Sequence, residues 1–239
     1  KDSCWIKIFK DGQTKFDEQD YDEAINTFTA LMEIAPDSVK TIKMLAYCYN
    51  SKGDSDKTME YFIKVAQIDE QDEIVRQQIA NTYFENGNYD EALKWFTAAS
   101  EIHPENPDNY FNLAIVYNKQ EDHAAAFSAM AKAVEYDPDN MDAILSASNY
   151  AAAAGLFDES YLYLEKAIAL QPDNIDYLSF LSYKLFQAEQ YEKMIEYAKM
   201  WYELDNNSKE AAQLVYQGAK KIGDKPLETK FETILRNMQ

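Results

Sequence analysis

The feature that most constrains this chain is a sequence repeat with a period of 34 residues. The string Tyr-Asp-Glu-Ala begins at Tyr21 and again at Tyr89, and a related Phe-Asp-Glu-Ser string begins at Phe157, so successive copies lie two periods apart. Prolines and glycines keep the same step along the chain. The residues in phase are Pro36, Pro104, Pro138 and Pro172, and Gly53, Gly87, Gly155 and Gly223. Two residue types with different backbone roles share one period, which indicates a chain built from copies of one small structural unit.

Cutting the sequence at this period gives seven units with no insertion between them. The units begin near Trp5, Val39, Glu73, Pro107, Met141, Ile175 and Lys209. Within a unit the apolar residues recur at helical spacing in two runs, which predicts two helices. The glycine is expected to end the first helix, and the acidic residues that follow it favour the start of the second. The proline falls in the loop to the next unit, where no backbone donor is needed.

The pattern inside the units resembles that of the tetratricopeptide repeat (TPR) family, which has small residues at positions eight, twenty and twenty-seven of each repeat. In the third and fourth units these residues are Ala80, Ala92, Ala99, Ala114, Ala126 and Ala133. The resemblance implies an all-α fold, a right-handed α-solenoid of seven 34-residue helix-turn-helix repeats that forms one superhelical domain over residues 1–239. It also implies that the first helix of every repeat lines the concave side.

The two ends of the array depart from the pattern. Asp11 and Lys15 occupy positions that are usually apolar, so the leading helix is expected to be less buried than the others. In the last two units large residues replace small ones, which predicts looser or rearranged packing. They are Met194, Trp201 and Tyr216. The last helix is polar where a further repeat would dock, so residues 209–239 are expected to act as a C-terminal cap.

The side chains expected on the concave face combine amides with aromatics. The predicted partner-binding residues are Lys43, Tyr47, Gln77, Asn81, Phe84, Phe111, Asn112, Ile115, Asn149, Phe180 and Tyr183. An Asn or Gln side chain offers both a donor and an acceptor, which matches the alternating groups of an extended peptide backbone. Solvated helix faces also carry such amides, and aromatic side chains can pack on neighbouring helices, so both interpretations remain open.

The formal net charge of -19 argues against a nucleic-acid partner, because binding phosphates requires a basic stripe. It also disfavours anionic membrane surfaces. The cationic clamp that some TPR proteins use for acidic C-termini is not matched, since the positions that should follow Lys43 hold Tyr47, Gln78, Asp108 and Asn112. The expected partner is therefore a neutral or basic protein or extended peptide.

Catalytic motifs are lacking from the sequence. His103 and His123 have no partner nucleophile in the register, and there is no HExxH, glycine-rich phosphate loop or Gly-x-Ser-x-Gly string. Cys4 and Cys48 lack metal-ligand spacing. We therefore expect no enzyme, cofactor or metal site, but a protein-protein interaction scaffold or adaptor that binds a peptide or protein segment in its concave groove. The alternative is a self-assembling scaffold that dimerises through the irregular C-terminal repeats.

The location in the cell is less constrained by the sequence. No apolar run approaches the roughly 18 residues that span a bilayer. Two cysteines without a disulfide framework favour a reducing compartment, so a cytoplasmic location is expected. A periplasmic or membrane-anchored location is the alternative if a signal segment upstream of Lys1 was removed.

Overall fold

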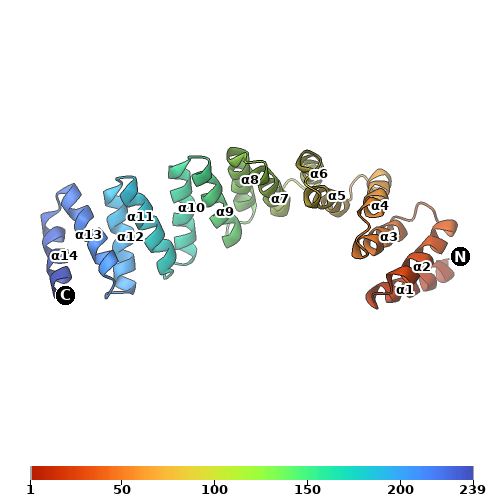
Figure 1. The fold of residues 1–239 in the computed structure, drawn as a ribbon, viewed down its shortest axis with the longest axis horizontal. Helices are drawn as coiled ribbons and strands as arrows, with labels where there is room; N and C mark the ends of the chain where they lie inside the picture. Colours follow the sequence, from red (N-terminus) through yellow and green to blue (C-terminus); the bar gives the residue numbers. More distant parts are fainter. Residues whose placement is uncertain (1, 239) are drawn as a thin grey trace. The chain divides into compact units, whose positions relative to one another are not determined.

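A computed structural model describes residues 2–238, and within that range the chain folds into fourteen helices without a strand (Figure 1). The first helices of the repeats are α1 (Asp2–Asp17), α3 (Val39–Ser51), α5 (Glu73–Glu85), α7 (Pro107–Lys119), α9 (Met141–Ala153), α11 (Ile175–Gln187) and α13 (Lys209–Ile222). The second helices are α2 (Tyr21–Ile34), α4 (Ser55–Ile68), α6 (Tyr89–Ile102), α8 (His123–Tyr136), α10 (Phe157–Leu170), α12 (Tyr191–Leu204) and α14 (Lys225–Asn237). The all-α helical-repeat fold is thus confirmed. From α3 onward every first helix begins at the predicted residue, whereas α1 begins at Asp2, ahead of the predicted Trp5.

The turn inside each repeat depends on one residue in the left-handed backbone conformation. In four repeats this residue is the predicted glycine, and the φ angles of Gly53, Gly87, Gly155 and Gly223 lie between 76° and 78°. In the other three repeats the same position holds a residue with a side chain. These residues are Gln19, Glu121 and Glu189, with φ angles of 63°, 62° and 58°. The turn geometry is therefore kept even where the sequence lacks the residue that favours it.

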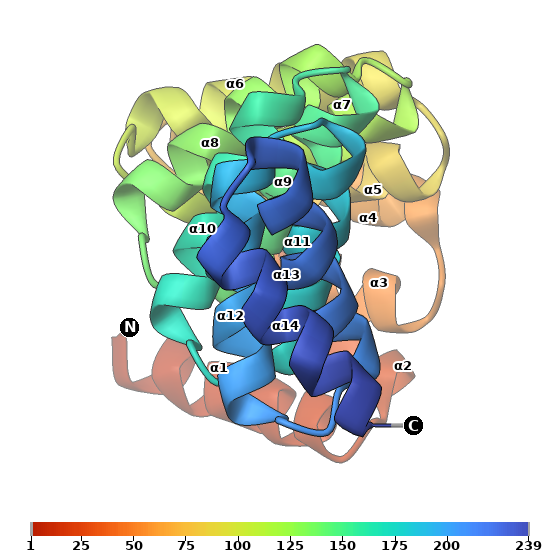
Figure 2. The same cartoon turned by 90° about the vertical axis from the view of Figure 1, so that its left-hand side faces the viewer.

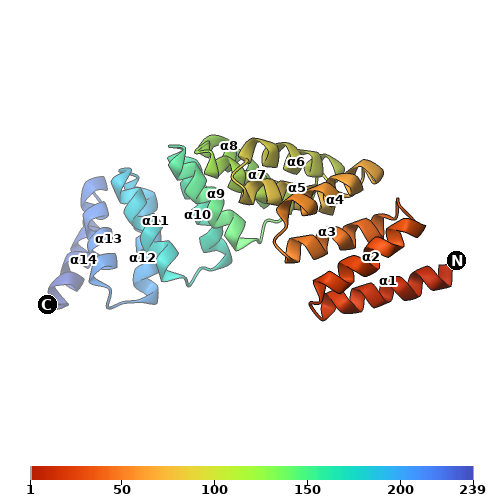
Figure 3. The ribbon, with the colours of Figure 1, turned by 45° about the vertical axis from the view of Figure 1, so that its right-hand side comes forward.

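The chain divides into two compact units, the first ending at Tyr136 and the second beginning at Asp137. The first unit contains α1 to α8, and the second contains α9 to α14. Figure 3 shows the helix pairs of the first unit following one another in chain order, which agrees with contacts between successive helices. The single superhelix over the whole chain stays a prediction.

The leading helix of the first unit is held mainly through a close helix crossing. Gly12 of α1 is buried against Phe28 of α2, and a Cβ at Gly12 would lie 2.7 Å from the Phe28 ring. Apart from Gly12, no side chain described for α1 is buried. Asp11 is exposed and pairs with the half-buried Lys15 at 3.0 Å. The prediction that this helix is less buried is confirmed.

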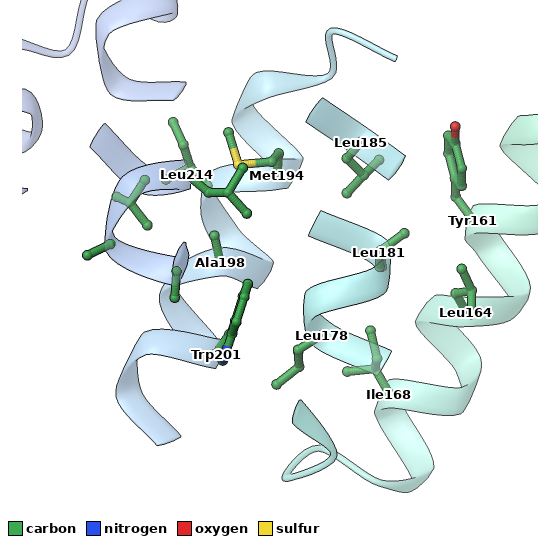
Figure 4. Close-up of a cluster of buried hydrophobic side chains, with 14 of the residues drawn as sticks. Tyr161, Leu164, Ile168, Leu178, Leu181, Leu185, Met194, Ala198, Trp201 and Leu214 are labelled. Atoms are coloured by element: carbon green, nitrogen blue, oxygen red, sulfur yellow. The ribbon is translucent and has the colours of Figure 1, made fainter. Parts of the chain in front are cut away.

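The core of the second unit is continuous from α10 to α14. Leu178, Leu181 and Leu185 of α11 are fully buried, and Figure 4 shows them between side chains of α10 and α12. Met194 of α12, at a position that is usually small, is also fully buried. Gly218 of α13 makes room for it, because a Cβ there would lie 2.5 Å from the Met194 Cε atom. The packing is rearranged, as predicted, and it is not loose at this point.

The last helix, α14, buries one described side chain, that of Phe231, against the rest of the second unit. In Figure 2 this helix lies nearest the viewer, beside α13. Its acidic residues pair locally, Glu228 with Lys225 at 2.8 Å and Glu232 with Arg236 at 3.0 Å. The Glu232 and Arg236 side chains are exposed, whereas the Glu228 side chain is only 15% exposed.

Candidate functional site

A cavity of about 600 Å³ opens between the fifth and sixth repeats, within the second unit. Its lining comes from the second half of α9, the turn after it, the first turns of α10 and the second half of α11. Two of the predicted partner-binding residues, Asn149 and Phe180, belong to this lining. The volume falls in the range of about 300–1,000 Å³ that is usual for ligand pockets.

Small residues form part of the lining of this cavity. Ala152 in α9, Gly155 in the turn and Ala188 just after α11 all line the cavity. Lys52 and Gln120 lie at the position of Ala188 in earlier repeats. Both of these have long side chains that reach a carboxylate of the preceding repeat, whereas Ala188 cannot.

The equivalent contacts can be compared directly. At the junction of the first two repeats the Lys52 ammonium pairs with Asp22. At the junction of the third and fourth repeats the Gln120 amide donates to Asp90 at 2.7 Å. At the cavity the equivalent carboxylate, Asp158, receives only the Gln190 amide at 3.0 Å, from the turn before α12. Asp158 thus forms no ion pair with a described residue.

The walls of the cavity are aromatic, and its rim is polar. The Phe157 and Phe180 side chains line it and are 58% and 48% exposed. The Lys184 ammonium lies 5.3 Å from the centre of the Phe180 ring. Asn149 and Gln187 are exposed at the rim, and neither amide side chain bonds to another described residue. These amides are available to a ligand.

The floor of the cavity is polar but already satisfied. Ser148 and Ser160 are both buried, and the Ser148 hydroxyl donates to the Ser160 carbonyl oxygen at 2.9 Å. The two hydroxyl oxygens are 3.0 Å apart. A ligand in the cavity would therefore be bound by the walls and the rim.

Three of the predicted binding residues in the first unit are engaged by other side chains of the protein. Lys43 pairs with the largely buried Asp72. Tyr47 packs edge-on against Phe62, with ring centres 5.5 Å apart. The amide of Gln77 donates to the Asn109 side chain at 2.8 Å. These contacts stabilise the stacking of repeats.

The Gln77 contact belongs to a polar network that the sequence did not reveal. The Glu73 carboxylate in α5 accepts hydrogen bonds from Asn106 at 2.6 Å and from Asn109 at 2.7 Å. Asn109 is fully buried, and Gln77 also donates to Glu73 at 3.2 Å. The network joins the third repeat to the fourth. Its only signal in the sequence is a glutamate that lies 33 and 36 residues before two asparagines.

Five of the remaining predicted residues belong to the first unit and do not line the cavity. Asn81, Phe84, Phe111, Asn112 and Ile115 are half-buried there, and the side chains of Asn81 and Asn112 bond to no other described side chain. Asn149 belongs to the second unit, and a ladder that joins the three asparagines stays a prediction.

Tyr183 is 43% exposed but does not line the cavity. It packs edge-on against Trp201, with ring centres 6.0 Å apart. Tyr183 therefore lies on the α12 side of α11.

The described residues include no group of three or more His, Cys, Asp and Glu side chains that could hold a metal ion. Both histidines make local contacts, His103 with Glu73 at 3.8 Å and His123 with Asn118 at 3.2 Å. Burial raises the pKa of the Cys48 thiol to about 11, so this thiol stays protonated near neutral pH. Over residues 2–238, no helix has the length and apolar character needed to cross a membrane.

Comparison with protein families places TPR units along much of the first unit. A TPR repeat model matches residues 80–121, and a tetratricopeptide repeat model matches residues 107–140. Residues 17–99 match the model for anaphase-promoting complex, cyclosome, subunit 3. The chain is a TPR-family protein. A search of curated proteins found no match to it.

Solved TPR structures share the fold at low sequence identity. One structure of MamA protein is 23% identical, with 72% of this chain and 95% of that chain covered and a TM-score of 0.63. YrrB, described as a TPR protein with an unusual peptide-binding site, is 20% identical, with 78% and 96% covered and a TM-score of 0.57. A tetratricopeptide repeat protein from Parabacteroides merdae is 14% identical, with 98% and 93% covered and a TM-score of 0.62. These similarities show a shared fold alone.

Proposed function

We propose that this TPR protein is a non-catalytic scaffold that binds a segment of a partner protein, with the cavity between the fifth and sixth repeats as its anchor. The observation that carries the proposal is the lining of the cavity. Two half-exposed phenylalanines lie beside amides that have no partner in the described chain. Apolar walls with a few placed polar groups are typical of a site that binds another molecule.

An extended segment fits the rim better than a compact ligand does. Asn149 lies on α9 and Gln187 on α11, so their amides come from two neighbouring repeats. Each can both donate to and accept from a peptide backbone. The cavity between them would then take one side chain of that segment. The description of YrrB names a peptide-binding site in another protein of this fold.

A catalytic role has less support. Asp158 and Glu159 are the carboxylates of the cavity, and they are adjacent in the first turn of α10, where acidic residues stabilise a helix. No histidine, cysteine or pair of facing carboxylates lines the cavity. Nothing in the lining supplies an activated nucleophile.

The alternative of a homodimer through the C-terminal repeats also has less support. The large residues that motivate it pack inside the second unit. Trp201 is only 8% exposed, and Tyr202 packs edge-on against Phe231 with ring centres 5.3 Å apart. These side chains leave little surface for a second copy.

The proposal is tested by filling the cavity. Ala152→Trp places a large side chain in the cavity from an exposed position of α9, and Ala153→Trp adds the same side chain at an exposed neighbour outside the lining. The chain and both variants are used for affinity capture, and the bound proteins are quantified by mass spectrometry. Proteins that the unchanged chain and the Ala153→Trp variant capture should not be captured by the Ala152→Trp variant. The melting temperatures of the unchanged chain and the two variants should be equal. Equal retention by the two variants would refute the proposal.

A further inference from the structure

We propose that the cavity between the fifth and sixth repeats selects a basic side chain, arginine or lysine, and pairs it with Asp158 and Glu159. This inference rests on the proposed function, since the basic side chain belongs to the bound protein segment. It specifies the chemistry of the residue that enters the cavity.

The first argument is a contact that the protein makes within itself. At the junction of the first two repeats, the ammonium of Lys52 binds the carboxylate of Asp22. The hydrogen bond to Asp22 raises the pKa of Lys52, which favours the charged form of the lysine. Asp158 occupies the position of Asp22, and Ala188 occupies the position of Lys52. The cavity junction therefore lacks the lysine that binds the equivalent carboxylate at the first junction, and a basic side chain from a partner can pair with Asp158 instead.

The second argument is the charge around the cavity. Residues 141–187, which span the three helices that line the cavity, include six acidic and two basic residues, so a basic segment is attracted to this region. Both basic side chains lie over aromatic rings, Lys166 over Tyr163 at 4.7 Å and Lys184 over Phe180 at 5.3 Å. Neither forms an ion pair with a described carboxylate within 4.0 Å. Glu159 is exposed and likewise has no ion-pair partner among the described residues.

The third argument is the shape of the lining. Arginine and lysine have long apolar stems and a charged tip, and they bury the stem while the tip stays at the polar rim. Phe157 and Ala152 offer an apolar surface to such a stem. Asp158 and Glu159 line the same cavity, so a stem on this apolar surface has both carboxylates within the same lining. An uncharged side chain would leave both carboxylates without a cationic partner.

Substitution of Lys184 tests the charge of the side chain that enters the cavity. The Lys184 ammonium lies in the same cavity as the two carboxylates. If the ligand side chain is basic, Lys184 repels it, and Lys184→Gln should tighten binding. If the ligand side chain is acidic, Lys184 attracts it, and the same substitution should weaken binding. The two ligand classes thus predict opposite changes.

The experiment begins with a library of random displayed peptides selected on the full chain, and the enriched peptides are then synthesised with a fluorescent label. Dissociation constants are measured by fluorescence anisotropy at low ionic strength. The expected peptides carry an arginine or lysine whose replacement by Ala weakens binding about tenfold, a typical loss for a partly desolvated ion pair. Asp158→Asn should weaken binding by about the same factor, and Asp90→Asn, at the same repeat position in the first unit, should leave it within about twofold.

A gain of charge provides the sharpest comparison. Ala188→Lys restores the residue found at Lys52, so it should pair with Asp158, close the cavity and abolish binding. Ala153→Lys adds the same charge at an exposed position outside the lining and should change binding little. Two results would overturn this inference alone. One is that Ala152→Trp blocks the binding of enriched peptides that need no basic residue. The other is that Lys184→Gln weakens the binding of the enriched peptides. If no cavity variant changes peptide binding, the proposed function fails together with it.

Discussion

Replacing Glu121 or Glu189 by glycine should stabilise the protein, although each substitution removes a whole side chain. Both glutamates lie in the left-handed turn inside a repeat, with φ angles of 62° and 58°. Neither side chain makes a hydrogen bond or ion pair to another described residue. At the same position Gly53 and Gly87 have φ angles of 76°, and the space around them is open. The glutamates therefore retain the strain of the turn and gain no contact in return.

The size of the effect follows from two opposing terms. The left-handed conformation costs a residue with a Cβ roughly 1–2 kcal/mol. Glycine increases the entropy of the unfolded chain, which lowers the gain by about 0.5–1 kcal/mol. The expected net stabilisation is about 0.5–1 kcal/mol for each substitution. Because Glu121 lies in the first unit and Glu189 in the second, the two effects should be independent.

Urea unfolding followed by far-ultraviolet circular dichroism measures the effect. Repeat arrays can unfold in steps, so the midpoint of each transition is compared at a constant slope. Glu85→Gly, in the last turn of α5, should lower the midpoint, because that residue is helical. Gly87→Glu should also lower the midpoint, because it should reduce the free energy of unfolding by about 1 kcal/mol. A lower midpoint for both Glu121→Gly and Glu189→Gly would refute the argument from backbone strain.

Three further predictions concern single residues. With the Cys48 thiol pKa raised to about 11 by burial, a maleimide at neutral pH should label only the exposed Cys4 in the folded chain and both thiols after denaturation, as counted by mass spectrometry. Glu73→Ala leaves the buried amide of Asn109 without its acceptor and should lower the free energy of unfolding of the first unit by about 1–3 kcal/mol in urea titrations. Gly218→Ala should lower the melting temperature, because the strain of a Cβ 2.5 Å from a buried methionine costs about 1–3 kcal/mol and outweighs a helix-propensity gain of about 1 kcal/mol; an unchanged or higher melting temperature would contradict it.

The helical-repeat fold could be predicted because the period is uninterrupted. Once Gly53 and Gly87 set the register, each first helix from α3 onward begins at the predicted residue, and the second helices follow the same step. Local signals were sufficient for these elements, since helix starts and turns depend on a few neighbouring residues. The division at Tyr136 was not predicted. A contact boundary depends on packing between helices, which the period does not encode.

The candidate site could be predicted only in part. Asn149 and Phe180 were recognised because they occupy first-helix positions that do not pack against neighbouring repeats. Gln77 was proposed for the same reason, yet its amide bonds to Asn109. Its partner lies almost a full repeat away, and the pattern of one repeat does not show which polar side chains of the next repeat will reach it. The lack of an ion pair at Asp158 was not predicted either, because the small size of Ala188 has meaning only beside the Lys52 contact.

The comparison of repeats also explains how one junction can be open without loss of the fold. Lys52 and Asp22 are 39% and 77% exposed, and an ion pair so exposed contributes little to stability. Losing this pair at Ala188 therefore costs the array little, because each repeat is stabilised mainly by apolar packing against its neighbours. The Phe157 and Phe180 side chains are exposed at this junction. Ala188→Lys should then keep or slightly raise the melting temperature while it removes ligand binding, and a variant that lowers both would show that the fifth junction cannot adopt the geometry of the first.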